Sequence, residues 1–310
     1  MKSRQSATGS NVGRVVASHG RDALVADAAG GRLRCRLRSR RLAVVCGDRV
    51  RWIAEHTEGA AGLITEVLPR TSLLSRLSQR GDSEPVAANL TQLAVVVAPV
   101  PAPDFGLCDR YLAAAEWAGL KACIVANKCD LGDGHAVLAA ALGEFAELGY
   151  PVVPASKRIA GGGDALAAQL AAETSVLVGQ SGAGKSSLTN LLVPGVDAVI
   201  AELSQDGRSG RHTTTCAALA SLPGGGELID SPGVRDFAPP LPPPRDVAGG
   251  FREIAALAPH CRFKDCRHGR EPGCAVAAAA GGIAARRIAS YRRLLQQAEE
   301  MARREPRLRR

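Results

Sequence analysis

The stretch Gly179-Gln180-Ser181-Gly182-Ala183-Gly184-Lys185-Ser186 constrains the fold of this chain more than any other part of the sequence. It follows the apolar run 175–178 and precedes a segment, 187–192, that we expect to be helical. A strand that turns through glycines into a helix start points backbone N–H groups at one spot, where phosphate binds. Glycine is needed at 179 and 184, because the loop takes dihedral angles that side chains forbid and lets the backbone approach the phosphates. The stretch predicts a P-loop, and its context disfavours a chance glycine-rich turn.

Length and composition set the outer limits of the interpretation. With 310 residues, 46% of them hydrophobic, the chain can form two or three domains with sizeable cores. The first 13 residues are polar and the apolar run 93–103 is too short to span a bilayer, so we expect a cytoplasmic protein with no membrane partner. Six of the nine cysteines are scattered singly, which argues against a disulfide framework.

Charge is distributed unevenly along the chain. The formal net charge is +9 at pH 7, and the basic excess lies in residues 1–90 and 241–310, whereas residues 91–240 are acidic overall. Basic ends around an acidic middle suggest that the ends meet a polyanion and the middle performs the chemistry. The arginines can partly reflect genomic base composition, so charge alone only suggests contact with nucleic acid.

Residues 12–70 contain five short strand-like runs, which is typical of a small barrel of the oligonucleotide-binding (OB) type. The expected strands are 13–17, 23–26, 32–37, 48–53 and 62–68. The third alternates arginines with apolar residues, so one face carries Arg32, Arg34, Arg36 and Arg38, which would suit an RNA backbone. A solvated outer face is an equal alternative, because no aromatic residue is interleaved for base stacking.

From residue 89 onward, strand-like and helical runs alternate. Strands are expected at 92–98, 121–126 and 151–155, and helices at 109–118, 136–148 and 164–172, before the strand that leads into the P-loop. This alternation predicts an open, mostly parallel α/β sheet with ligand sites at the carboxyl ends of its strands.

The tetrapeptide Asn127-Lys128-Cys129-Asp130 directly follows one of these strands. A carboxylate there can accept hydrogen bonds from the N1–H and 2-amino groups of guanine, which adenine does not offer. With a P-loop in the same sheet, it predicts a guanine reader. Ser156 and Lys157 end the next strand, where GTPases place a short segment over the base. The predicted GTP contacts are Asn127, Lys128, Asp130, Ser156, Lys157, Gly179, Gln180, Ser181, Gly182, Ala183, Gly184, Lys185, Ser186, Ser187 and Gly233.

A magnesium ion would be held by residues before, within and after the polar stretch 196–216. The strand before Asp230-Ser231-Pro232-Gly233 places Asp230 near Mg²⁺ and the Gly233 N–H near the γ-phosphate. Ser186 supplies a hydroxyl, and a threonine of Arg211-His212-Thr213-Thr214-Thr215 would complete the ligands. We favour Thr214, although three consecutive threonines leave the choice open.

The order of these motifs is unusual, because the guanine reader precedes the P-loop whereas ordinary GTPases have the reverse order. Cutting one connection of a parallel sheet and joining the old ends keeps the strands and their ligand-facing ends in place. The chain is therefore predicted to be circularly permuted.

A proline-rich spacer, residues 239–244, leads to Cys261-x4-Cys266-x-His268-x5-Cys274. Three thiolates and one imidazole supply the four ligands of a closed, structural zinc site. A redox role is less favoured, because no Cys-x-x-Cys pair is present. Residues 282–304 then predict a basic helix with an apolar stripe of Ile283, Ile288, Tyr291, Leu294 and Leu295.

Together these features resemble the circularly permuted, small-subunit-dependent GTPases of bacteria, the RsgA or YjeQ family. The resemblance implies three domains: an OB-type barrel (1–80), the permuted P-loop GTPase (88–240) and a zinc-binding helical domain (241–310). We expect one structural Zn²⁺, and Mg²⁺ with GTP or GDP, and nothing in the sequence suggests more than a monomer. Such a protein binds the 30S subunit and its 16S rRNA late in maturation, and its slow hydrolysis of GTP is stimulated by the subunit. Lys157 departs from the family, where a small residue is commoner.

Two functions of different classes remain open on the sequence. The chain is either a GTPase switch acting on the ribosome or an RNA-binding assembly factor for which GTP is a structural ligand. Val234 keeps the second open, because it follows Gly233 at the position where Ras-like enzymes use a glutamine to orient the attacking water. A permuted GTPase that serves the large subunit is a weaker third possibility.

Another residue must position the water, and His212 beside the threonines is the candidate, a role that the resemblance also implies. We expect His212→Ala to keep GTP affinity but to lower subunit-stimulated turnover by a factor on the order of 10² or more, as for loss of a water-positioning group. Steady-state turnover with and without 30S subunits measures this. Unchanged stimulated turnover would identify His212 as an ordinary surface residue.

Overall fold

The computed structural model describes residues 10–39, 41–57, 60–77, 83–194, 217–230, 239–269, 271–279 and 281–308. Contacts divide the chain into two compact units. The first comprises Met1–Thr91, Leu170–Leu177 and Thr189–Phe237, and the second Gln92–Gln169, Val178–Leu188 and Ala238–Arg310. The three domain ranges predicted from the sequence stay a prediction. No helix within the described ranges is long and apolar enough to cross a membrane.

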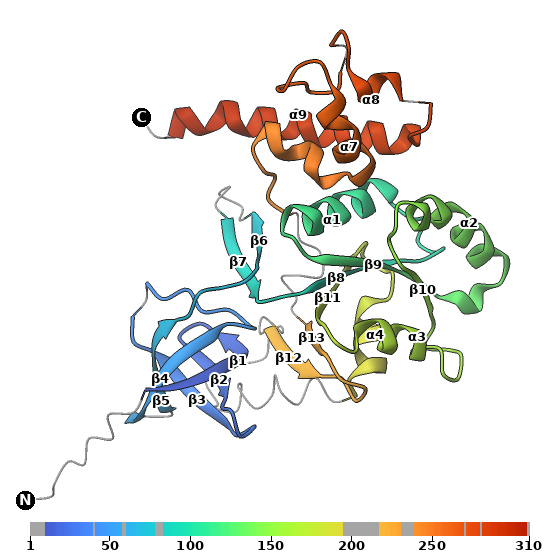
Figure 1. The fold of residues 1–310 in the computed structure, drawn as a ribbon. Coiled ribbons are helices and arrows are strands. Elements are labelled where there is room, and N and C mark those ends of the chain that lie inside the picture. Colours follow the sequence, from blue (N-terminus) through green and yellow to red (C-terminus); the bar gives the residue numbers. More distant parts are fainter. Residues whose placement is uncertain are drawn as a thin grey trace, which may run out of the picture. The chain divides into compact units, whose positions relative to one another are not determined.

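The first unit contains the predicted five-stranded barrel (Figure 1). Its strands are β1 (Asn11–His19), β2 (Asp22–Ala26), β3 (Arg32–Leu37), β4 (Arg49–Thr57) and β5 (Ala60–Val67). The pairings β1–β2, β2–β3, β3–β5, β5–β4 and β4–β1 close the ring, and only β3–β5 is parallel. The OB-type barrel is thus confirmed.

Alternation of side chains along β3 separates the barrel interior from its surface. Cys35 and Leu37 are buried and pack with Val15, Val25 and Ile64, while the intervening arginines lie on the outer side. Trp52 is also buried in this cluster, at 9% exposure, so it provides no stacking surface outside the barrel.

Strand β1 also pairs outside the barrel, with a group of three strands that includes the strand before the P-loop. It pairs with β12 (Ala217–Ser221), which pairs with β13 (Glu227–Asp230), and β13 runs parallel to β11 (Thr174–Gly179). Arg14 on β1 donates to Glu227 Oε2 at 2.5 Å and to Thr174 Oγ1 at 3.2 Å, which ties the barrel to this sheet. Strand β12 and the hairpin of β6 (Leu73–Leu77) with β7 (Ser83–Ala88) were not predicted from the sequence.

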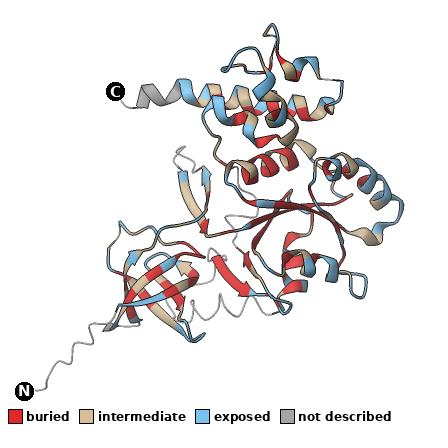
Figure 2. Cartoon of the chain, in the orientation of Figure 1, coloured by how far each residue is buried: buried red, intermediate tan, exposed pale blue. Residues whose placement is uncertain are grey.

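The second unit contains the predicted parallel strands β8 (Gln92–Val97), β9 (Lys121–Asn127) and β10 (Val152–Ala155). Their helices are α1 (Phe105–Trp117), α2 (Asp133–Glu147) and α3 (Asp164–Leu170). Every residue of β8 is buried, as expected for a parallel strand covered on both faces (Figure 2). Val97 pairs with Ala126, and Ala155 with Asn127, so the carboxyl ends of the three strands meet at one edge.

Beyond the spacer, the chain packs short helices around the long C-terminal helix α9 (Ala285–Leu308). The short elements are η2 (Pro244–Gly250), α7 (Arg252–Leu257), η3 (Ala258–His260) and α8 (Ala275–Ala278). Their core contains the predicted apolar stripe together with Phe251 and Ile254. Ala113 of α1 also belongs to this core. The amphipathic helix is therefore confirmed, and it begins three residues later than expected.

The sequence pattern suggested that the arginines of α9 lie on its solvent face, but two of them do not. Arg287 is only 1% exposed; it donates to Asp109 Oδ1 at 2.9 Å and to Glu253 Oε1 at 2.7 Å. Arg286 pairs with the other oxygen of Asp109 and with Glu144. Asp109 is fully buried in α1, so this cluster, which we call the α9 ion cluster, joins α9 to α1.

Removing Arg287 should destabilise the second unit. Arg287→Met leaves Glu253 and half of the buried Asp109 carboxylate without a partner, and we expect a loss of about 3 kcal/mol in the free energy of unfolding. Chemical denaturation followed by tryptophan fluorescence measures it. The matched control is Arg303→Met, whose exposed pair with Glu299 is 3.8 Å long and should contribute less than ~1 kcal/mol. Equal losses in both variants would contradict the buried cluster's role.

Candidate functional site

The predicted P-loop lies between the end of β11 and the start of α4 (Lys185–Leu192). Gly179 has φ +137°, and a Cβ there would lie 2.2 Å from the Val96 carbonyl oxygen. Gly184 has φ +101°, and its Cβ would lie 2.3 Å from Asn127 Nδ2. Both glycines are therefore required by close neighbours in the protein as well as by their dihedral angles.

The loop wraps around the ammonium group of Lys185. Lys185 is 6% exposed, and its Nζ donates to Gly179 O at 2.6 Å and to Gln180 O at 3.0 Å. Ser186, the next residue, is exposed. The Gln180 side chain accepts a hydrogen bond from the Asp104 N–H at 3.0 Å, at the start of α1, a contact that the sequence did not indicate. The loop thus presents a cation and a hydroxyl at one end of a helix, an arrangement suited to phosphate and a metal ion.

Two residues of the predicted guanine reader brace the P-loop. Asn127 is 4% exposed, and its Nδ2 donates to Ala183 O at 2.7 Å. Lys128 adopts a left-handed conformation with φ +61°, and its Nζ donates to Gly182 O at 2.9 Å and to Val100 O at 2.5 Å. The sequence suggested contacts with nucleotide for both side chains and gave no local signal of this bracing, because the P-loop partners Ala183 and Gly182 lie more than fifty residues away.

The carboxylate of the reader is prepared to accept hydrogen bonds. Ser156 Oγ donates to Asp130 Oδ1 at 2.5 Å, which lowers the pKa of the Asp130 carboxyl. Asp130 is therefore ionised at neutral pH, with its side chain 16% exposed. Lys157, on the same loop as Ser156, reaches Ser187 Oγ with its Nζ at 3.2 Å. A guanine edge at Asp130 and phosphates at Lys185 would thus be recognised by connected segments of one unit.

Asp230 ends β13 in the first unit and is 7% exposed. The remaining predicted residues, His212, Thr213, Thr214, Thr215 and Gly233, lie outside the described residues. Their assigned roles, like those of the other site residues, stay predictions.

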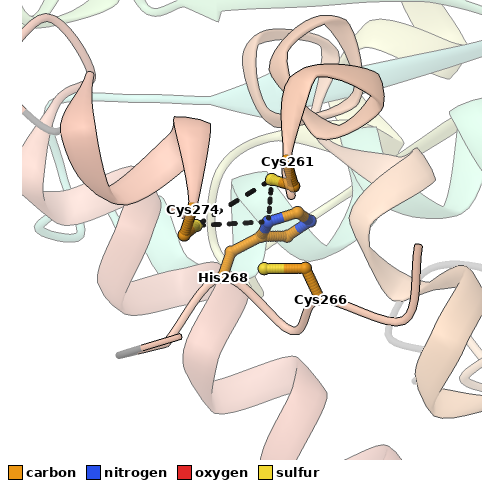
Figure 3. Close-up of side chains that lie close together, drawn as sticks. All are labelled: Cys261, Cys266, His268 and Cys274. Atoms are coloured by element: carbon orange, nitrogen blue, oxygen red, sulfur yellow. Dashed lines mark hydrogen bonds between the residues drawn. The ribbon is translucent and has the colours of Figure 1, made fainter. Parts of the chain in front are cut away.

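Cys261, Cys266, His268 and Cys274 come together between α7 and α8 (Figure 3). Their ligand atoms all lie within 4.8 Å of one another. Cys261 Sγ is 3.5 Å from His268 Nδ1 and 4.0 Å from Cys274 Sγ, and Cys274 Sγ is 3.7 Å from His268 Nδ1. A sulfur separation of 4.0 Å excludes a Cys261–Cys274 disulfide, whose sulfurs would lie about 2.05 Å apart.

These separations fit a tetrahedral zinc ion. Bonds of about 2.3 Å to sulfur and about 2.0 Å to nitrogen place neighbouring ligands roughly 3.5 to 3.8 Å apart. Burial lowers the pKa of the His268 imidazole, which favours the neutral ring that a metal requires. The four residues can therefore hold one zinc ion with no open position, as the sequence predicts.

Surrounding contacts hold the cluster in shape. The Glu271 carboxylate accepts from the Arg267 N–H at 3.0 Å and from the Gly269 N–H at 2.7 Å. Tyr291 of α9 donates to Arg267 O at 3.0 Å, and its ring lies 6.0 Å from that of His268. The metal-binding segment is thus fixed onto α9, which the α9 ion cluster joins to α1.

The arginine face of β3 is partly neutralised. Asp22 on β2 accepts from Arg34 at 2.9 Å and from Arg36 at 3.4 Å, whereas Arg32 and Arg38 are exposed. The sequence placed all four on one face and did not reveal this acidic neighbour, which lies on the adjacent strand.

Comparison with known proteins gives one consistent result. The model of the RsgA GTPase family matches residues 67–239. The small ribosomal subunit biogenesis GTPase RsgA of Azotobacter vinelandii is 49% identical over 271 residues, which cover 86% of this chain and 78% of that protein. Its counterpart in Ectopseudomonas mendocina is 46% identical over 278 residues, covering 88% and 80%.

Solved structures agree with this result. YjeQ from Thermotoga maritima superposes with a TM-score of 0.73 at 30% identity, covering 94% of this chain and 99% of that one. YloQ, described as a circularly permuted GTPase, superposes with a TM-score of 0.72 at 23% identity, covering 97% and 99%, which shows the shared fold. The permuted order predicted from the motifs is confirmed.

The metal site yields a direct prediction. Cys274→Ser should lower the bound zinc from one equivalent to a small fraction and loosen the segment between α7 and α8, because the coordination energy stabilises that segment. Metal analysis by atomic emission after gel filtration measures the zinc. Cys129→Ser, a partly exposed cysteine outside the cluster, is the control and should keep one equivalent. A full equivalent of zinc in Cys274→Ser would contradict the assignment.

Proposed function

The chain belongs to the RsgA GTPase family, and from this premise we propose that it binds the small ribosomal subunit and assists its late maturation. It is a GTP hydrolase. The proposed cycle has slow hydrolysis in the free monomer, faster hydrolysis on the subunit, and a nucleotide-dependent check or release of the mature subunit in the cytoplasm. The names of the relatives support the ribosomal assignment, and the acidic centre with basic flanks supports a polyanionic partner.

One observation carries the nucleotide part of the proposal: the guanine reader is hydrogen-bonded directly to the P-loop. The ionised Asp130 would accept from the guanine edge, with Ser156 holding its carboxylate, while Asn127 and Lys128 keep the reader at a fixed position relative to the loop. Base and phosphates are then read as one ligand, which favours GTP and GDP over adenine nucleotides.

For the phosphates, the loop from Gly179 to Ser187 would supply backbone N–H groups, with Lys185 as the cation. Mg²⁺ would be held by Ser186, Asp230 and Thr214 and would neutralise charge that develops on the phosphates. Gly233 would donate its N–H to the γ-phosphate, and His212 would orient the attacking water in place of a glutamine.

The flanking parts would bind 16S rRNA of the 30S subunit. On the barrel, Arg32 and Arg38 are the better candidates for phosphate contacts, because they are exposed to solvent, whereas Arg34 and Arg36 are half-buried. The zinc ion, bound by Cys261, Cys266, His268 and Cys274, would act structurally by holding the module between α7 and α8.

The decisive measurement compares GTP turnover of the protein alone, with 30S subunits, with 50S subunits and with free RNA at fixed salt, since the binding of basic flanks depends on salt. We expect a large stimulation by 30S subunits only, because only the correct surface would order the catalytic residues. Tight GTP binding without stimulation by any partner would instead favour an RNA-binding assembly factor with GTP as a structural ligand. Stimulation by 50S subunits alone would reassign the partner.

A further inference from the structure

One aromatic ring is exposed on the segment between α7 and α8 that carries the four predicted zinc ligands, which we call the zinc module. Of the eight large apolar side chains that are exposed in the described part of the chain, only Phe263 is aromatic, at 43% exposure. It lies between the zinc ligands Cys261 and Cys266, in the segment Arg262-Phe263-Lys264-Asp265, all four residues of which are exposed. Aromatic residues make up only 3% of this chain, so an exposed one is uncommon here.

The backbone that carries Phe263 is held on both sides. The Cys266 N–H donates to Phe263 O at 3.2 Å, and the Arg262 N–H donates to Gly273 O at 3.0 Å. Gly273 has φ +76°, and a Cβ there would lie 2.9 Å from Arg262 Cβ, so the Arg262 stem packs against the Gly273 backbone. With both flanking cysteines positioned to bind one metal ion, the ring would lose little conformational entropy when a ligand stacks on it.

The ring is flanked by cations. The Arg262 guanidinium carbon lies 5.4 Å from the centre of the Phe263 ring, and Lys264 follows it in the chain. Neither Arg262 nor Lys264 forms an ion pair with any residue that the structure describes. Figure 1 shows the segment between α7 and α8 on the side of α9 away from α1, and the exposure of Phe263 in this segment leaves its ring accessible to solvent.

We propose that Phe263 stacks on an unpaired base of RNA while Arg262 and Lys264 contact the phosphates on either side of that base. An exposed ring between two cations matches an unpaired nucleotide, which offers a π-face and flanking negative charge. A base-paired helix offers no free base face, and an apolar protein pocket would have to accommodate two charges beside the ring. This inference rests on the proposed function only in taking ribosomal RNA as the source of the nucleotide.

The test uses the full-length protein loaded with zinc and a fluorescein-labelled, unstructured RNA of about 12 nucleotides, with the matched duplex as a control. Phe263→Ala should weaken binding of the single strand roughly 5- to 100-fold and leave duplex binding unchanged, in line with the loss of one stacked base. Phe263→Tyr keeps the ring and should bind within about 2-fold of the wild type, whereas Phe263→Leu keeps apolar volume without a π-face and should resemble Phe263→Ala.

Salt dependence separates the two kinds of contact. Arg262→Ala and Lys264→Ala should each reduce the slope of log K against log salt by about 0.7, the value for one phosphate contact on a single strand, whereas Phe263→Ala should leave the slope unchanged. Zinc content and thermal unfolding of each variant show that the module stays folded. Wild-type affinity in Phe263→Ala, or wild-type affinity in Phe263→Leu, would overturn the stacking proposal.

Measurements with 30S subunits keep this proposal distinct from the proposed function. If 30S subunits fail to stimulate the wild type while Phe263→Ala still loses single-strand affinity, the proposed function fails and stacking stands. If Phe263→Ala needs no higher 30S concentration than the wild type for half-maximal stimulation and binds the oligomer normally, stacking fails and the proposed function stands. Weaker 30S binding by Phe263→Ala, rescued by Phe263→Leu, would indicate an apolar protein contact and would also overturn stacking.

Discussion

The hydrogen bond from the Asn127 side-chain amide to the Ala183 carbonyl makes one site out of two motifs that lie far apart in the sequence. Both groups are buried, so neither can exchange its partner for water without a cost of about 1–3 kcal/mol. Lys128 adds two bonds to the same region. These contacts connect the segment of Asp130, the predicted base-reading carboxylate, to the phosphate loop, as specific recognition of a whole nucleotide would require.

The zinc module depends on a comparable set of buried contacts. Its small apolar core includes Ala113 of α1, and the α9 ion cluster places two arginines against the fully buried Asp109. Each oxygen of the Asp109 carboxylate pairs with an arginine, and Arg287 also pairs with both oxygens of Glu253, which offsets the cost of burying these charges. The core and the α9 ion cluster together hold the segment that carries the four metal ligands against α1.

Much of the fold follows from local patterns. The period-two alternation of β3 and the mostly apolar runs of β8 and β9 could be recognised in the sequence, because the surroundings of each strand determine which residue types it carries. Strand β12 and the β6–β7 hairpin were not predicted, because such short segments form strands only where a partner strand is available. For β12 the partners are β1 and β13, and β6 and β7 pair with each other. The helix α9 was predicted, but the burial of Arg287 was not, because a charged residue signals a solvent face until its partners are known.

The sequence by itself determined the family and the permuted order of the GTPase motifs, and it predicted a phosphate loop, a guanine-reading carboxylate and four zinc ligands. These are properties of residue types at short spacings, which local backbone geometry translates directly into structure. Only the tertiary structure decided that Asn127 and Lys128 brace the P-loop, that Asp22 pairs with Arg34 and Arg36, and that Phe263 is exposed with the Arg262 guanidinium near its ring. Such contacts and exposures depend on which distant segments pack together, and no local pattern of residues encodes that packing.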